Sequence, residues 1–459
     1  MKKYRRPFSR DAISRRDFIR LTGGAIGAAI LASCQEATPE PTEAPPPAEG
    51  ELAYKGTLDV WDWEYPAREN LVNELIVDWQ AMHPDIPINY LPLPWADIET
   101  KILAVGTAGD APPISDVYYG WRYDLQRAEV IAPYPEDFVD WEERISTPFM
   151  KDDEGRIRAF PSGWFVDMIY YNTELFEQEG LTGEDIPKSW DDFFKLADQL
   201  TQRDAGGTVL VAGCGMNDYW QHEYLWQDLI YQLGGWMYNE DGTEALWEED
   251  PSVEALQFIQ DWYFKHNIDS RDLPEGYGSF CNDLAVMFLG SGWNHGFFMA
   301  DFPDMEGRWD TAPLPTFTGE PLPSYGIASP EENFQVFSQH PADIQEASFA
   351  FINHLMVGED RDVRWTVAQG SAPDAKGMLD DPRILEIPGV RSQAETMEYR
   401  VCFGERPIEA EKYWRTMFDE VTLEEGDVRE ALHTATHAIN EDLPTKKRYF
   451  TERNYSPPA

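Results

Sequence analysis

Aromatic side chains beside acidic or amide side chains are the residues of this sequence best suited to binding chemistry. Many tryptophans stand next to Gly, Asp or Asn near expected strand ends and loops. A flat aromatic face covers the apolar side of a sugar ring, while a polar neighbour holds its hydroxyls. The aromatic candidates for ligand contact are Trp63, Trp95, Tyr119, Trp121, Trp164, Trp236, Trp293 and Tyr325. The polar candidates are Asp62, Asp116 and Asn294, which flank them.

Two further chemical signals lie in the first residues. A basic segment is followed by a small, apolar run from Leu21 to Ser33. As a helix this run would span only about 20 Å, so residues 1–33 are interpreted as a signal peptide rather than a membrane span. The stretch around Arg15 and Arg16 resembles a twin-arginine export signal. The segment ending at Cys34 resembles a lipobox, in which that cysteine is lipidated.

Residues 34–55 are rich in Pro and Glu and have little to bury, which is typical of an extended tether. No later apolar run reaches the length of a membrane-spanning helix. We therefore expect an exported protein, anchored to the outer face of the cytoplasmic membrane by lipidated Cys34. Contact with the membrane would be through this lipid anchor only.

The composition of the chain limits the classes of partner that the protein is expected to bind. The 459 residues carry a formal charge of −46, which argues against nucleic acid as a partner because phosphate binding needs clustered Lys and Arg. Solubility or a salty habitat explains such acidity, and no calcium-loop motif supports a metal site. Cys214, Cys281 and Cys402 are expected to be small buried residues with at most one disulfide. Neither a metal nor a cofactor is expected.

The globular part opens with alternating strands and helices. Apolar spacing predicts strands over 58–63, 86–90 and 114–118 and helices over 71–82 and 98–105. This order is typical of right-handed βαβ units on a parallel sheet. Ligands of such sheets lie outside the carboxyl ends of the strands, which would place Trp63, Trp95 and the loop 118–121 near one crevice. Trp79, Trp190 and Trp262 follow helical patterns and are expected to be core residues.

Several segments resemble the family 1 extracellular solute-binding proteins, the group containing the maltodextrin-binding proteins. The resemblance runs from Thr57 to Leu443 in family order. It is carried by "TLDVWDW", "DWQAMHPDIPINY", "AVGTAGDAPPISDVYYGW", "AFPSGWFVDMIYYNTELFEQEGL", "PKSWDDFFKLADQLT", "LGGWMYNEDG", "DPSVEALQFIQDWY", "AVMFLGSGWNHG", "APLPTFTGEPLPSYGIAS" and "ALHTATHAINEDL". One departure is "GIASPEENFQVFSQHP", which is longer and more polar than the family pattern. It leaves the register between Ala328 and Pro341 open.

The resemblance implies an α/β, two-lobe periplasmic-binding-protein-like fold of type II, with lobes joined by hinge crossings. The crossings are expected near 160–163, 321–326 and 370–373. Residues 56–160 and 326–370 would then form lobe 1, and residues 161–325 and 371–459 would form lobe 2. Trp63 and the Tyr119/Trp121 loop are expected on one side of the cleft. Trp164, Trp236 and Trp293 are expected on the other.

The implied function is capture of a sugar or oligosaccharide in the interlobe cleft by a monomer, which delivers it to the permease subunits of an ABC importer. The same fold binding a polyamine, a peptide or another cation stays open, because acidity and aromatic residues also suit a cation. A secreted glycoside hydrolase is the enzyme alternative. However, no G-x-S-x-G motif is present and His222-Glu223 lacks the second His of H-E-x-x-H. Iron binding by the Tyr170-Tyr171 pair is disfavoured because neighbouring strand residues point to opposite faces.

Overall fold

The computed structural model describes the ranges 52–118, 121–122, 125, 128–152, 154–239, 242–321, 326–330, 333–402 and 409–443. These ranges fall in the unit from Leu52 to Ala459, which is described here by itself. The expectations for Arg15, Arg16, Cys34, Tyr119 and Tyr325, and for the tether as far as residue 51, lie outside the described residues. Within the described ranges, each helix is too short or too polar to traverse a lipid bilayer.

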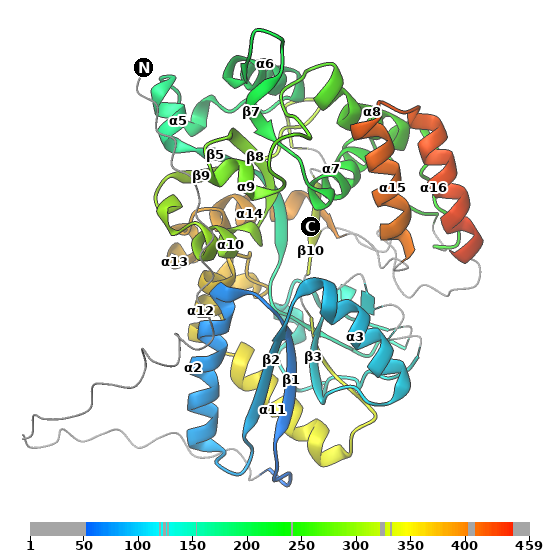
Figure 1. Ribbon diagram of the computed structural model, residues 1–459. Helices are drawn as coiled ribbons and strands as arrows, with labels where there is room; N and C mark the ends of the chain where they lie inside the picture. Colours follow the sequence, from blue (N-terminus) through cyan, green and yellow to red (C-terminus); the bar gives the residue numbers. More distant parts are fainter. Residues whose placement is uncertain are drawn as a thin grey trace, which may run out of the picture. The chain divides into compact units, whose positions relative to one another are not determined.

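The smaller sheet begins with the two parallel βαβ units that the sequence predicts (Figure 1). Its described strands are β1 (Leu58–Trp63), β2 (Ile88–Leu93), β3 (Ile114–Val117), β4 (Phe160–Pro161) and β11 (Asn333–Val336). β1 pairs in parallel with both β2 and β3. β11 is antiparallel to β3 and to β4, giving the order β2-β1-β3-β11-β4. The carboxyl ends of β1, β2 and β3 therefore meet at one edge.

Four of the described helices accompany the smaller sheet. They are α2 (Pro66–Met82), α3 (Trp95–Ala108), α11 (Ala342–Met356) and α12 (Glu359–Gln369). Proline in the first turn opens α2, and the helix ends before Pro84, as the sequence predicts. Its buried face carries Leu71, Leu75 and Trp79 at helical spacing. The indole N–H of Trp79 donates to the Ile86 carbonyl oxygen at 3.0 Å, which joins α2 to the segment just before β2.

The larger sheet has the described order β12-β10-β5-β8-β7-β6, and β9 pairs with β5 beside this path. Its strands are β5 (Phe165–Asn172), β6 (Gln202–Arg203), β7 (Val209–Gly215), β8 (Ala285–Ser291), β9 (Trp309–Pro313), β10 (Gly326–Ser329) and β12 (Arg400–Cys402). β5 and β8 are buried throughout. Such continuous burial means that side chains cover both faces of the sheet.

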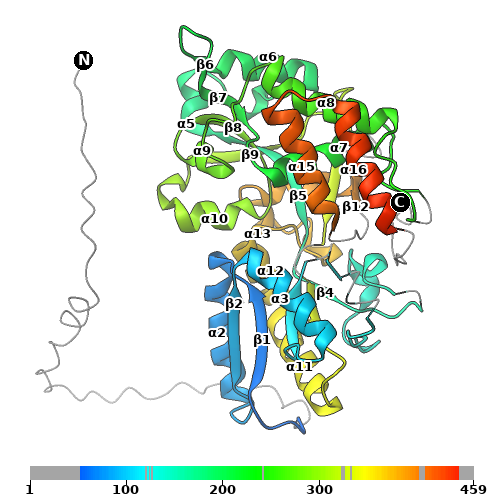
Figure 2. The same ribbon diagram turned by 45° about the vertical axis from the view of Figure 1, so that its right-hand side comes forward.

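The helices around the larger sheet include a pair near the end of the chain. The set comprises α5 (Thr173–Gln178), α6 (Trp190–Leu200), α7 (Tyr219–Gln232), α8 (Asp250–Phe264), α9 (Tyr277–Cys281), α10 (Asn294–Asp301), α13 (Pro382–Leu385), α14 (Val390–Thr396), α15 (Glu409–Leu423) and α16 (Val428–Asp442). Figure 2 shows α15 and α16, in red, lying side by side next to α8. α8 and α15 pack against α7, whose residues 221–232 are all buried.

The chain passes between the two sheets at places close to two of the expected crossings. β4 lies in the smaller sheet and β5 in the larger one, so the first passage is at residues 162–164. Trp164 and Ala372 exchange two backbone hydrogen bonds of 2.8 and 2.9 Å, which joins this passage to the segment after α12.

The passage expected near 321–326 is displaced. β10 pairs with β5 and β12 of the larger sheet, whereas β11 pairs with β3 and β4 of the smaller one. The change of sheet therefore falls between Ser329 and Asn333, after the predicted boundary at residue 326. The long polar stretch of the sequence contains two short strands that belong to different sheets. This division accounts for the register that sequence reasoning left open.

The three tryptophans that helical patterns assign to the core are buried, as predicted. Trp79, Trp190 and Trp262 are buried, and each indole N–H donates a hydrogen bond inside the protein. The described cysteines Cys214, Cys281 and Cys402 are also buried, and no disulfide joins them.

Candidate functional site

A pocket of about 250 Å³ lies where strand ends of the two sheets face each other. Its lining is aromatic apart from one carboxylate. The lining residues are Trp63, Trp95, Asp218, Trp220, Tyr224, Tyr277, Trp293 and Phe297. The volume is just below the usual range of small-molecule sites, about 300–1,000 Å³, so it suits a compact ligand.

The elements that carry the lining residues explain why they converge. Trp63 ends β1 and Trp95 begins α3 directly after β2. Asp218 precedes α7 after β7, and Trp293 precedes α10 after β8. The two aromatic residues Trp220 and Tyr224 are four apart on α7 and share one face. Each sheet thus contributes side chains from its carboxyl ends, the usual binding edge of open α/β sheets.

Ring contacts link the two halves of the pocket. Trp95 and Trp220 meet edge to face at 6.0 Å between centroids, and Trp63 meets Phe297 at 5.7 Å. Within each half, Trp63 lies 5.3 Å from Trp95. Trp293 lies 5.9 Å from Phe297 in an edge-to-face arrangement. Such contacts stabilise aromatic pairs by roughly 0.5–1.5 kcal/mol beyond area burial. The pocket wall is therefore held together by ring packing from both lobes.

Asp218 supplies the one carboxylate of this lining. Its Oδ1 accepts a hydrogen bond from the backbone N–H of Trp220 at 3.1 Å, which caps α7. Burial raises the pKa of Asp218, and the charge of Glu275 raises it further. The backbone bond and the charges of Arg415 and Arg271 oppose that rise. Asp218 is thus a carboxyl group in largely apolar surroundings, and the described lining of the pocket contains no Lys or Arg beside it.

Tyr65, the residue before α2, joins the two lobes beside the pocket. Its hydroxyl lies 2.8 Å from the Gln369 carbonyl oxygen, to which it donates, and it accepts from the Gly296 N–H at 2.9 Å. A Cβ on Gly296 would lie 2.1 Å from the Tyr65 hydroxyl oxygen, so a larger residue there would force the two apart. This contact holds the start of α10, which follows Trp293 and carries Phe297, against the smaller lobe.

The predicted aromatic candidates separate into two groups. Trp63, Trp95 and Trp293 line the pocket. Trp121 is buried behind the wall, 4.7 Å from the Trp95 ring. Trp164 is buried at the passage between the sheets, where its indole N–H donates to Asp374 at 2.9 Å. The expectation that Trp121 and Trp164 offer their faces to a ligand is therefore corrected for this structure, because protein atoms already cover both.

Two more candidates lie away from the pocket lining. Trp236 is half-buried, packs edge to face on Tyr231 at 6.0 Å and is not among the residues that line the pocket, so its expected ligand contact stays a prediction. Asn294 is buried, and its Oδ1 accepts from the Ser291 N–H at 2.8 Å. That bond positions the first turn of α10 rather than a ligand.

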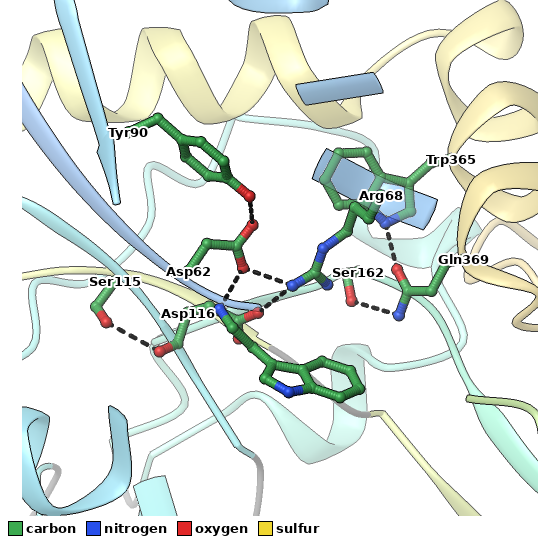
Figure 3. Close-up of polar contacts among 9 residues, drawn as sticks. Asp62, Arg68, Tyr90, Ser115, Asp116, Ser162, Trp365 and Gln369 are labelled. Carbon is green, nitrogen blue, oxygen red and sulfur yellow. Dashed lines mark hydrogen bonds and ion pairs between the residues drawn. The ribbon is translucent and has the colours of Figure 1, made fainter. Parts of the chain in front are cut away.

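The predicted polar residues Asp62 and Asp116 form a buried ionic group around Arg68 (Figure 3). The Arg68 Nη2 atom lies 2.5 Å from Asp62 Oδ1 and 3.0 Å from Asp116 Oδ2. Tyr90 donates to the other Asp62 oxygen at 2.7 Å. Burial raises the pKa of Asp116 well above its usual range, and Arg68 opposes this rise. The two carboxylates neutralise an internal cation, which corrects their expected role as direct ligand contacts.

This ionic group nevertheless reaches the pocket. The backbone N–H of Trp63 donates to Asp62 at 2.9 Å, and the Arg68 guanidinium lies 5.8 Å from the Trp63 ring centroid. On the other side Arg68 lies 5.7 Å from the ring of Trp365, whose indole N–H donates to Gln369. We infer that Asp62 and Arg68 position Trp63 from behind.

Sequence reasoning missed five lining residues. Asp218, Trp220 and Tyr224 follow β7 and could have been found with the strand-end rule that indicated Trp63. Phe297 follows Trp293 at helical spacing, which is a weaker signal. Tyr277 has no comparable signal, because α9 is five residues long and its neighbours are ordinary loop residues.

A second hollow of about 1,090 Å³ lies on the smaller lobe. It includes Arg144, which is paired with Asp362, and Arg156, which is paired with Asp152. Its charges are mixed and largely neutralise each other. It is larger than the aromatic pocket, yet it has no dense group of apolar faces with a few aimed polar atoms. The aromatic pocket is therefore the candidate site.

The chain belongs to the bacterial extracellular solute-binding protein family, whose model matches residues 63–355. One relative is an arabinooligosaccharide-binding protein from Halalkalibacterium halodurans. It is 24% identical over 352 residues, which cover 72% of this chain and 75% of the relative. Another is a lactose-binding protein from Rhizobium radiobacter, 22% identical over 57% of this chain and 62% of that protein.

Solved structures show the same fold. An ABC transporter solute-binding protein from Thermotoga lettingae, bound with alpha-D-tagatose, superposes with a TM-score of 0.72 at 19% identity, covering 84% of this chain and 99% of that one. The GacH receptor of Streptomyces glaucescens superposes with a TM-score of 0.70 at 18% identity, covering 86% and 100%. The type II two-lobe fold expected from the sequence is thereby confirmed.

Proposed function

We propose that this protein captures a sugar or short oligosaccharide in the aromatic pocket and delivers it to the permease subunits of an ABC importer. The observation that carries the proposal is the pocket itself, which is lined by seven aromatic rings from both lobes. Flat apolar faces are what the apolar sides of sugar rings require. The names of two relatives, which bind arabinooligosaccharide and lactose, support the same ligand class.

Binding without chemical change suits this pocket. Family members are binding proteins. Glycoside hydrolysis uses two carboxyl groups that flank the bond, about 5–10 Å apart. Among the described lining residues Asp218 is the one carboxylate. The protein is therefore proposed to release its ligand intact.

Closure of the lobes on the ligand is part of the proposal. Residues 56–160 and 326–370 would form lobe 1, except that β10 moves with the larger sheet. Residues 161–325 and 371–459 would form lobe 2. The passages at 162–164 and after Gly370 would then act as hinge segments, which absorb backbone rotation while the lobes move as bodies. Rings from both lobes meet only when the lobes are close, so closure completes the pocket.

The anchor is a separate proposal. We expect lipidation at Cys34 and export through the signal around Arg15 and Arg16 to place the protein on the outer face of the cytoplasmic membrane, where it acts as a monomer. Cys34→Ala should release the protein from the membrane fraction while leaving ligand affinity unchanged. Replacing both arginines with lysine should block export. An unchanged membrane fraction in Cys34→Ala would show that the lipobox interpretation is wrong.

A ligand screen tests the proposed function. Thermal unfolding of the purified full chain is measured against mono- and oligosaccharides. Ligand at 100 times its dissociation constant adds about 2.7 kcal/mol to the free energy of unfolding. For the ligand found, Trp293→Ala should lose on the order of 2 kcal/mol of binding by calorimetry. Trp236→Ala is the matched control, because Trp236 is half-buried in the same lobe but outside the pocket lining. Equal losses in both variants would refute the site.

A further inference from the structure

The chemistry of the pocket is that of an aromatic cage with one negative charge. Seven rings and the Asp218 carboxylate line it, and its described lining contains no Lys, Arg or His. The faces of aromatic rings carry negative potential and attract cations, most strongly for Trp. A neutral sugar gains from the apolar faces and can donate hydroxyl hydrogen bonds to the carboxylate. A ligand with a positive charge gains, in addition, from the charge of the carboxylate and from the negative potential of the ring faces.

The surroundings of Asp218 also bear on the binding of a positively charged ligand. One oxygen is engaged by the Trp220 N–H at 3.1 Å. Gly276 lies close on the side of the other oxygen, since a Cβ there would lie 3.0 Å from Oδ2. Trp220 already holds a cation at its ring, because the Arg415 guanidinium lies 5.6 Å from its centroid and 3.7 Å from that of Tyr219. Trp220 therefore packs against one cation, Arg415, whose charge also reaches Asp218.

We propose that the ligand is a saccharide carrying a cationic amino group, with its ammonium placed between Asp218 and the tryptophan rings. This inference rests on the proposed function. The sugar ring would stack on the remaining aromatic faces. A pocket of about 250 Å³ favours one or two sugar units. The formal charge of −46 on the chain also attracts cations toward the protein over long range.

The alternative role of Asp218 is structural, as the cap of α7 and an acceptor for sugar hydroxyls. Asn is as good an N-cap residue as Asp and keeps an acceptor oxygen. Asp218→Asn therefore removes the charge while preserving the cap. Trp220→Leu provides a second variant, which keeps an apolar contact but removes the π face.

The experiment is calorimetric titration of the full chain with matched series: glucosamine and galactosamine, their N-acetylated forms, glucose and galactose, and the corresponding disaccharides. Spermidine serves as a cation without a sugar. The proposal expects the free amines to bind most tightly. Asp218→Asn should weaken amine binding about 10- to 100-fold, as expected for loss of a charged hydrogen-bond partner, and weaken binding of the neutral sugars less, so that the preference for amines falls. Trp220→Leu should also reduce the preference for amines.

The outcomes separate this inference from the proposed function. Neutral or N-acetylated sugars that bind as tightly as the amines, with equal losses in Asp218→Asn, would overturn the cationic ligand and leave sugar capture standing. Binding of spermidine without any saccharide would overturn both. Absence of binding across all saccharide series would also overturn both. Urea unfolding of Asp218→Asn checks that the variant is folded, and Trp220→Leu tests the same preference for amines if it is not.

Discussion

Replacing Arg68 with Met should unbalance the buried ionic group of the smaller lobe. Met has similar length and fits an apolar site, but it leaves Asp62 and Asp116 without their shared cation. The Arg68 side chain is fully buried, and Asp62 and Asp116 are 0% and 2% exposed. Removing one partner of a buried ion pair costs about 3–5 kcal/mol, because the charge left behind has no solvent. We therefore expect the free energy of unfolding to fall by about that amount.

The loss should depend on pH in a definite direction. Burial raises the pKa of Asp116, and Arg68 is the charge that opposes the rise. Without Arg68 that pKa moves higher still, so the native state holds a proton that the unfolded chain, with an Asp pKa of about 3.9, has released. Stability then falls as pH rises, by at most about 1.4 kcal/mol per pH unit for one proton. The variant should lose more stability near pH 8 than near pH 5.

Urea unfolding followed by tryptophan fluorescence measures both effects. Arg364→Met is the matched control, because Arg364 pairs with Glu74 at 2.6 Å in the same lobe. This pair lies at the surface: the Arg364 side chain is 32% exposed and the Glu74 side chain is 62% exposed. Surface pairs of this kind contribute about 0–1 kcal/mol. If Arg68→Met cost no more than Arg364→Met, or if its cost did not grow with pH, the account of the buried group would be refuted.

Two further predictions concern packing and the contact between lobes. Trp79→Ala should lower the free energy of unfolding by about 3–5 kcal/mol and leave ligand affinity unchanged, because Trp79 is a buried core residue outside the pocket lining. Urea unfolding measures the stability, and calorimetry measures the affinity. Tyr65→Phe should lower the free energy of unfolding by about 1–3 kcal/mol, since buried partners at Gly296 and Gln369 lose the hydroxyl. Unchanged stability of Tyr65→Phe would mean that water replaces the hydroxyl.

The first third of the fold could be predicted from sequence because its signals are local. β1 spans the predicted residues 58–63, and α2 ends before Pro84 as expected. Apolar spacing and proline position act over a few residues and determine these elements. The stretch containing β10 and β11 is different. Each of these strands has four residues, and pairing with strands distant in sequence determines which sheet it joins. No local pattern therefore indicates the change of sheet.

The site was partly predictable for the same reason. The strand-end rule indicated Trp63 and Trp95, which line the pocket. It also indicated Asp62 and Asp116, whose carboxylates turn inward to Arg68 instead. An acidic residue at a strand end looks the same in sequence whether it faces a ligand or a buried cation. What decides between them is the position of Arg68 on the following helix, which only the assembled lobe shows.

The same residues explain why ligand binding and lobe contact should be coupled. Arg68 supports the Trp63 ring on one side and contacts Trp365 on the other. Trp365 donates to Gln369, and the Gln369 carbonyl accepts from Tyr65, which also contacts α10 of the opposite lobe. A ligand that contacts both Trp63 and Trp293 therefore contacts side chains of both lobes, and Tyr65 joins those lobes beside the pocket. Affinity in this pocket should consequently depend on the interlobe contact as well as on the rings that touch the ligand.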